Sequence, residues 1–163
     1  MQDHNSTPRF AAALTESRRA DESRAAQSAA IAAEQETTRA RLAAAAVERL
    51  EHLVRPLLDQ ARIEIEADGN GALVGTGRNR LGDLLATLRI LTGQAFEPEL
   101  VFTATHEGAR PFLGHHSEFY ARKTEYLPSE IPKVTEATIT AIIAAFLATP
   151  KLPPPSAGHE RQA

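Results

Sequence analysis

The stretch VFTATHEGARPFLGHHSEFYARK, residues Val101–Lys123, is the part of the chain that decides its fold. Around its start, Leu100, Phe102 and Ala104 alternate with more polar neighbours, which is the period-2 pattern of a half-buried strand. A second strand-forming segment, PFLGHHSEFY, follows the short run EGAR. We therefore predict a β-hairpin, and with it an antiparallel sheet in the C-terminal half of the chain.

Three of the six histidines, His106, His115 and His116, lie in this hairpin. Pairing across the turn places His115 opposite Phe102, or His116 there if the register shifts by one residue. In either register His106 lies roughly 13 Å further along the strand, at about 3.3 Å per residue. His115 and His116 are neighbours and point to opposite faces. Because imidazole nitrogens bind zinc at about 2.0–2.1 Å, these three side chains cannot share one ion, and we expect no metal site.

His115 and His116 are nevertheless the candidates for an ionisable catalytic group. One of them must face the apolar side of the hairpin, where burial can shift the pKa of an imidazole. The competing interpretation is a structural histidine that is hydrogen-bonded into the sheet. No Ser–His–Asp spacing and no pair of carboxylates accompanies them, which favours the structural interpretation.

Residues 10–61 predict one long helical segment. Strong helix formers dominate it, glycine is absent, and Pro56 is its one proline, which should kink the helix or begin a new first turn. Apolar residues recur there at spacings of 3 and 4, as in a coiled-coil seam. We predict self-association through this seam, at Val47, Leu50, Val54 and Leu57. The alternative is packing on the chain's own core, which Leu53 and Leu58 support by widening the stripe.

The next two segments predict a hairpin and a helix. RIEIEADGNGALVGTG, residues 62–77, alternates as a strand over 62–67, turns at DGNG and returns over Ala72–Thr76. In NRLGDLLATLRILTG, residues 79–93, leucines recur with helical spacing, Asn79 can cap the start and Gly93 can end it. We predict a helix here, with a buried strand over Leu84–Leu91 as the alternative.

After residue 128 the pattern returns to a helix that Thr135 caps. The expected order is a long helix and then β, β, α, β, β, α, an α+β sandwich with its helices on one face. This order resembles a permuted ferredoxin-like fold on a coiled-coil stalk, a layout found in assembly and scaffold proteins such as soluble domains of bacterial secretion and pilus platforms. The resemblance covers element order alone and implies no activity. The expected divisions are a flexible N-terminus (1–9), a helical segment (10–61), an α+β domain (62–149) and a flexible proline-rich tail (150–163).

The sequence GTGRNR, residues 75–80, is the best candidate for a ligand site. A strand-to-helix connection here would present free N–H groups at a helix N-terminus, and glycines would let an anion approach the backbone. The expected anion site consists of Gly75, Gly77, Arg78 and Arg80, with the arginines adding bidentate contacts. The competing interpretation is an ordinary turn with two solvated arginines, since neither a Walker A loop nor a dinucleotide fingerprint is present.

Composition excludes several classes of function. The chain of 163 residues has no cysteine, which rules out disulfides, thiolate metal sites and a cysteine nucleophile. Its net charge of −3 makes nucleic-acid binding, through Arg78, Arg80, Arg89, Arg122 and Lys123, a lesser alternative. No apolar run approaches the roughly 20 residues that span a bilayer, and the N-terminus lacks the order of a signal peptide. We expect a cytoplasmic protein without a cofactor.

These observations favour a protein–protein interaction or scaffold module, rather than an enzyme, that self-associates or docks a partner through its N-terminal helix. The second hypothesis is a small-ligand-binding or enzymatic domain. It would use the anion site at Gly75–Arg80, with His115 or His116 as the ionisable group.

Overall fold

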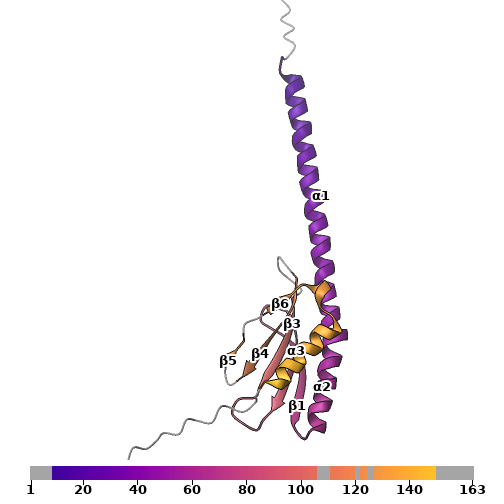
Figure 1. The fold of residues 1–163 in the computed structure, drawn as a ribbon. Helices are drawn as coiled ribbons and strands as arrows, with labels where there is room; N and C mark the ends of the chain where they lie inside the picture. Colours follow the sequence, from indigo (N-terminus) through magenta and orange to yellow (C-terminus); the bar gives the residue numbers. More distant parts are fainter. Residues whose placement is uncertain (1–8, 106–110, 120–121, 125–126, 150–163) are drawn as a thin grey trace, which may run out of the picture. The chain divides into compact units, whose positions relative to one another are not determined.

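The computed structural model describes residues 9–105, 111–119, 122–124 and 127–149. The chain forms two compact units, Met1–Thr38 and Arg39–Ala163, and the boundary falls within helix α1, Ala11–Arg49 (Figure 1). The second unit contains helices and an antiparallel sheet, so the α+β class and the long N-terminal helix are confirmed. Among the described residues, no helix combines the length and apolar character needed to cross a bilayer.

A wide helical turn separates α1 from α2. Leu50–Val54 form a single π-helical stretch, η1, in which the Arg55 N–H donates to the carbonyl oxygen of Leu50, five residues back. Helix α2, Arg55–Ala67, begins immediately afterwards with Pro56 in its first turn, as one of the two predicted roles of this proline requires. Proline has no N–H and its ring clashes with the carbonyl four residues earlier, which explains the change of hydrogen-bond pattern here.

The strand predicted over 62–67 is wrong, because these residues form the end of α2. Ile65 is buried and Ile63 is 57% exposed, so the two isoleucines lie on different faces of a helix rather than on one face of a strand. Gly69, at φ 87°, ends the helix: its N–H donates to the Glu66 carbonyl, and the Asn70 N–H donates to the Ile65 carbonyl. This is the Schellman arrangement, in which a left-handed residue follows the helix. The DGNG run is therefore a helix cap and not a hairpin turn.

Within the described ranges, the sheet has six strands, all paired antiparallel. Their order is β1-β2-β3-β4-β5, and β6 also pairs with β4. The strands are β1 Gly71–Arg78, β2 Leu84–Leu91, β3 Glu99–Ala104, β4 Leu113–Phe119, β5 Arg122–Lys123 and β6 Leu127–Ser129. The predicted hairpin is confirmed as β3 and β4, and its register places Phe102 opposite His115 as expected. The return strand predicted over Ala72–Thr76 lies within β1.

The helix predicted over 79–93 is also wrong, and the alternative strand over Leu84–Leu91 is confirmed as β2. Ala86, Leu88 and Ile90 are buried against the core, while Leu85 and Leu91 lie on the opposite face of the strand, so apolar side chains occur on both faces. The leucines therefore mimic helical spacing without forming a helix. Without a helix between the two hairpins, the expected ββαββα order is not observed, and the ferredoxin-like arrangement is not confirmed.

The last helix, α3, covers Glu136–Ala148 and begins as predicted, with Thr135 Oγ1 accepting a hydrogen bond from the Thr138 N–H. It follows a short 3-10 turn, η2, Ile131–Lys133. Figure 1 shows α3 crossing one face of the strands. Side chains from η1, α2 and α3 share one core with the inward face of the sheet; its largest fully buried members include Phe102, Leu58, Leu88, Leu100, Leu113 and Ile139.

Candidate functional site

His115 faces the helices. Its ring lies 5.9 Å from that of Phe102, between ring centroids, at a tilt of 37°. It lines a hollow of about 420 Å³ between the sheet and α3, together with Ser117 on the same strand and Thr138 on the helix. Burial lowers the pKa of His115 below its usual value, so the imidazole is neutral at pH 7. No described carboxylate lines this hollow to orient or activate the ring.

His116 lies on the other face of β4, as the alternation of a strand requires. Burial is the main cause that lowers its pKa; Lys123 and His115 act in the same direction, while Glu118 opposes them. Its Nε2 is 3.9 Å from Oε1 of Glu118, which also lies 3.8 Å from the Lys123 ammonium. Because the imidazole is neutral at pH 7, Lys123 is the cation that pairs with Glu118.

The two histidines are thus separated by the sheet, as predicted. His106 lies outside the described residues, and no group of three potential metal ligands occurs among the residues that are described. The confirmed register leaves the geometric argument against a shared metal ion unchanged. The expectation of no bound metal stays a prediction, which elemental analysis of protein purified without a histidine tag would test.

The glycine–arginine segment does not precede a helix, so the premise of the expected anion site is wrong. Gly75 and Gly77 lie within β1, and residues 79–83 form the loop to β2. Asn79 organises this loop: its Oδ1 accepts from the N–H groups of Leu81 and Asp83, at 2.9 and 3.0 Å. Such side-chain-to-backbone bonds make a turn, and they compete with helix capping.

Arg78 and Arg80 have different environments. Arg78 donates from Nη1 to the Gly82 carbonyl at 2.8 Å, and it lines a pocket of about 290 Å³ with Arg55 and Glu51 of the helical segment. Arg80 is exposed in the loop and does not line this pocket. No histidine lines it either, so the structure does not bring the expected anion-binding residues together with His115 or His116.

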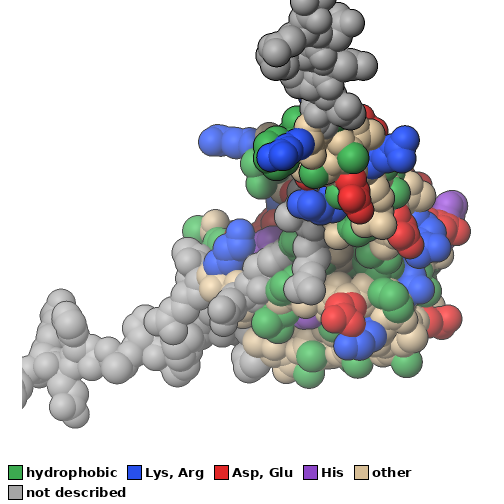
Figure 2. Space-filling view, turned by 90° about the horizontal axis from the view of Figure 1, so that it is seen from above, with side chains coloured by type: hydrophobic (Ala, Val, Ile, Leu, Met, Phe, Trp, Pro, Cys, Tyr) green, Lys and Arg blue, Asp and Glu red, His purple; other side chains and the backbone are tan. Residues whose placement is uncertain are grey.

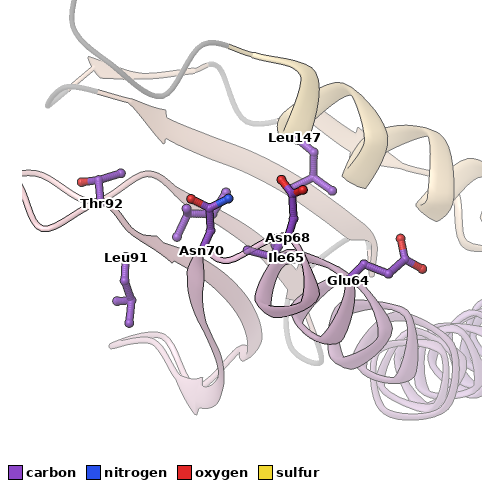
Figure 3. Close-up of a pocket in the computed structure, with 8 residues that line it drawn as sticks. Glu64, Ile65, Asp68, Asn70, Leu91, Thr92 and Leu147 are labelled. Carbon is purple, nitrogen blue, oxygen red and sulfur yellow. The ribbon is translucent and has the colours of Figure 1, made fainter.

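A second pocket, of about 510 Å³, lies where α2, the end of β2 and α3 meet. Glu64 and Asp68 contribute carboxylates, and Asn70 and Thr92 contribute further polar groups. In Figure 3, the polar ends of Glu64 and Thr92 point in opposite directions. The polar groups therefore do not converge on one point, which a specific small-molecule site requires.

The predicted self-association seam is used inside the chain. Leu50 is 3% exposed and Val54 is fully buried, and both belong to the core of the second unit. Val47 and Leu57 are partly buried and pack against that core. These positions match the alternative interpretation, packing on the chain's own core. Association through them would require the core to open.

Residues 9–38 present a different surface. Every one of them is exposed, although residues 11–38 are helical throughout. Large apolar side chains are among those exposed: Phe10 is 72% exposed, Leu14 is 58% and Ile31 is 57%. Charged residues are spread around this part of the helix, and one ion pair, Arg24 with Asp21 at 3.4 Å, is itself largely in solvent. The sequence predicted self-association at residues 47–57 instead, because large apolar side chains are more frequent there than in residues 9–38.

Charges of both signs are interspersed on the face seen in Figure 2. Two of the five basic residues considered for nucleic acid have acidic partners: Arg89 pairs with Glu99 at 3.2 Å and Lys123 with Glu118. The side chain of Arg122 lies outside the described part of the chain. Binding to a phosphate backbone favours a continuous basic surface, which these pairs do not provide.

Sequence reasoning missed one residue that organises the second unit. Arg49 donates from Nη1 to the carbonyl oxygens of Ile131 and Val134, and so links the end of α1 to the segment that precedes α3. An arginine at a helix C-terminus is expected to be solvated or to complement the helix dipole. Nothing in the local sequence indicates a contact with residues more than 80 positions away.

No protein family model, curated protein or solved structure matches this chain.

Proposed function

We propose that the protein is a protein–protein interaction or scaffold module, and that residues 10–38 are its docking surface. The observation that carries the proposal is the complete exposure of a long helix with Phe10, Leu14 and Ile31 on its surface. Burying a side chain of this size contributes about 1.5–3 kcal/mol, so a partner that covers these three gains affinity.

The second unit offers no better binding surface among its described residues. Its apolar helical face is already occupied by its own sheet, and its pockets do not gather catalytic groups among the described residues. A separately folded domain that carries a solvated helix is suited to binding through that helix. Helix-in-groove and helix-pairing interactions both use anchors on one face, spaced by three or four residues.

Site-specific photocross-linking in the expressing cell tests the proposal. A cross-linking residue at Leu14 or Ile31 should trap a defined protein, which mass spectrometry identifies and which then binds the purified chain. The matched control is Arg19, exposed on the same helix but about 140° around it from Leu14 at 100° per residue. Equal trapping at all three positions, or none at any of them, would contradict a docking surface on this face.

A second candidate function rests on the pocket shared by Arg55, Arg78 and Gly77. A Cβ added at Gly77 would meet nothing within 4 Å, so the backbone in this pocket is open to a small anion, which Arg55 and Arg78 would attract and the carboxylate of Glu51 would oppose. Phosphate or a nucleotide at a hundredfold above its Kd would then stabilise the fold by about 2.7 kcal/mol. Arg55→Ala with Arg78→Ala should abolish that shift in melting temperature. Arg80→Ala with Lys133→Ala removes equal charge elsewhere and should preserve it; equal loss in both would refute the site.

A further inference from the structure

The large apolar side chains of residues 9–38 lie on one stripe of the helix. At 100° per residue, Leu14 lies about 40° from Phe10, and Ile31 lies about 60° to the other side of it. The same stripe follows alternating steps of 4 and 3 residues through the whole exposed segment. Its positions are Phe10, Leu14, Ser17, Asp21, Arg24, Ser28, Ile31 and Gln35. These steps are the spacing of the a and d positions in the seam of a two-stranded coiled coil; three of the eight positions are apolar and five, including the centre, are polar.

We propose that this seam pairs antiparallel with the same seam of a second copy of the chain. The pairing rests on the proposed function and names its partner. The stripe is self-complementary about its centre: Leu14 meets Ile31 of the second copy, Ser17 meets Ser28, and Asp21 meets Arg24. Each contact occurs twice, because the two helices are related by a twofold axis.

Charge selects this orientation. Asp21 and Arg24 already form an ion pair within one helix, with side chains 66% and 76% exposed. In the antiparallel pair each carboxylate lies between two guanidinium groups, one from each chain, and the four charges form a network. In a parallel pair in register, Asp21 would face Asp21 and Arg24 would face Arg24. Like charges in a seam oppose association, so the parallel arrangement is disfavoured.

Small side chains beside the seam favour close approach. The positions that flank it between residues 11 and 34 are occupied mainly by alanine, at Ala11, Ala13, Ala20, Ala25 and Ala32. The remaining flanking positions are Arg18, Gln27 and Glu34. In the antiparallel pair Arg18 faces Ala25 and Glu34 faces Ala13, so no two like charges meet at the flanks. The flanks therefore add no like-charge repulsion to the pair, whereas the polar centre lowers its affinity and fixes its register.

Disulfide trapping tests the orientation without interference, because the chain has no cysteine of its own. In the proposed pair, Ser17→Cys in one chain lies opposite Ser28→Cys in the other. Two copies of Ser17→Cys are offset by about 11 residues, or roughly 16 Å along the axis, beyond the reach of a disulfide, whose Cα atoms are usually about 4.4–6.8 Å apart. In a glutathione buffer, a mixture of the two variants should give the mixed disulfide in large excess over either homodimer. Predominant homodimers would overturn the antiparallel register.

A control variant separates pairing from random collision. Ser23→Cys lies on the opposite side of the exposed helix, away from the seam. It should form no disulfide with Ser17→Cys above the level seen in denaturant. Comparable yields for Ser23→Cys and Ser28→Cys would show that the seam does not direct association.

Charge reversal tests the network at the centre. Asp21→Arg places arginines opposite arginines, and Arg24→Asp places aspartates opposite aspartates, so each variant alone should raise the dimer Kd by about tenfold or more. An equimolar mixture restores every opposite-sign contact and should dimerise nearly as tightly as the unmodified chain. Light scattering at micromolar to ~100 micromolar concentration provides the readout, with circular dichroism as the check that helix content is retained.

The outcomes distinguish this inference from the proposed function. A full-length protein that stays monomeric over this concentration range overturns the antiparallel self-pairing. If photocross-linking at Leu14 or Ile31 nevertheless traps a different, defined protein, the docking surface stands and its partner is that protein. A dimer unaffected by either charge reversal also overturns the inference, because it must then form elsewhere.

Discussion

Replacing Leu50 by alanine should destabilise the second unit strongly and independently of protein concentration. The side chain is 3% exposed and packs among Val54, Leu58 and the inward face of the sheet. Leucine-to-alanine changes at such positions cost about 2–5 kcal/mol, through lost burial and the cavity left behind. Each 1 kcal/mol lowers the melting temperature by roughly 4–8 °C in a domain of 60–100 residues. Urea unfolding followed by far-ultraviolet circular dichroism would measure the change.

The matched control is Ile63→Ala in α2, where the side chain is 57% exposed. Its effect should stay within about 0.5 kcal/mol. If Leu50 instead formed an intermolecular seam, the destabilisation by Leu50→Ala would vanish on dilution to concentrations at which the chain is monomeric. That result, or equal effects of the two substitutions, would refute the assignment of Leu50 to the chain's own core.

Three further predictions concern the second unit. Arg49→Met should lower the stability of the second unit by about 1–3 kcal/mol, because two partly buried carbonyl groups lose a charged hydrogen-bond donor. The control Arg62→Met removes an exposed ion pair and should change that stability by less than about 1 kcal/mol. Burial lowers the folded-state pKa of His115, so the unfolded chain binds the proton more readily, and stability should be full above about pH 6.5 and fall as pH drops towards the folded-state pKa. His115→Gln should reduce that slope in a urea-midpoint profile, and His116, whose pKa is also lowered, should account for part of what remains. Gly75→Ala should destabilise more than Gly77→Ala in thermal unfolding, because the new Cβ would lie 2.8 Å from Thr87 Oγ1 at the first site and would touch nothing within 4 Å at the second.

The existence of the β3–β4 hairpin could be predicted, because alternation and a short connection dominate its sequence, but two adjacent registers remained open. The chain between its strands is short, but β3 is buried on both faces, so burial alone does not choose between the registers. The structure has the register in which Phe102 opposes His115. Thr135 was also predictable, because a helix start needs a side-chain acceptor and this residue supplies one.

The errors arose where one pattern fits two structures. Ile63 and Ile65 alternate as in a strand, yet a helix also separates them by about 200°. The glycine that follows, Gly69, decides between the two, since it permits the left-handed helix cap. In β2 apolar residues occur on both faces, with Ala86, Leu88 and Ile90 buried and Leu85 and Leu91 on the other side, so the leucine spacing also fits a helix.

The predicted interaction surfaces were also limited by patterns that fit two structures. Apolar spacing located the correct face of residues 47–58, but spacing does not reveal what covers that face, which is the chain's own sheet. The exposed stripe from Phe10 to Gln35 is thinner in apolar residues and so gave no comparable signal. This stripe is proposed as a docking surface because Phe10, Leu14 and Ile31 are exposed, and exposure cannot be read directly from the sequence.

The π-helical turn accounts for the shift between the predicted and observed buried stripes. A strict heptad from Leu50 and Val54 places Leu57 at the centre of the face, but Leu58 is fully buried and Leu57 only partly. The π-helical turn before Pro56 contains one more residue than an α-helical turn, so the next buried position is Leu58 rather than Leu57. The buried positions in this region are therefore four residues apart: Ala46, Leu50, Val54 and Leu58. In a regular α-helix of 3.6 residues per turn, side chains four residues apart rotate gradually around the helix and would leave the core. The π-helical turn corrects this rotation. Pro56 is therefore the sequence feature that lets one continuous helical face stay on the sheet. Replacing it with alanine would let the α-helical hydrogen bonds form, at the expense of the packing of Leu58.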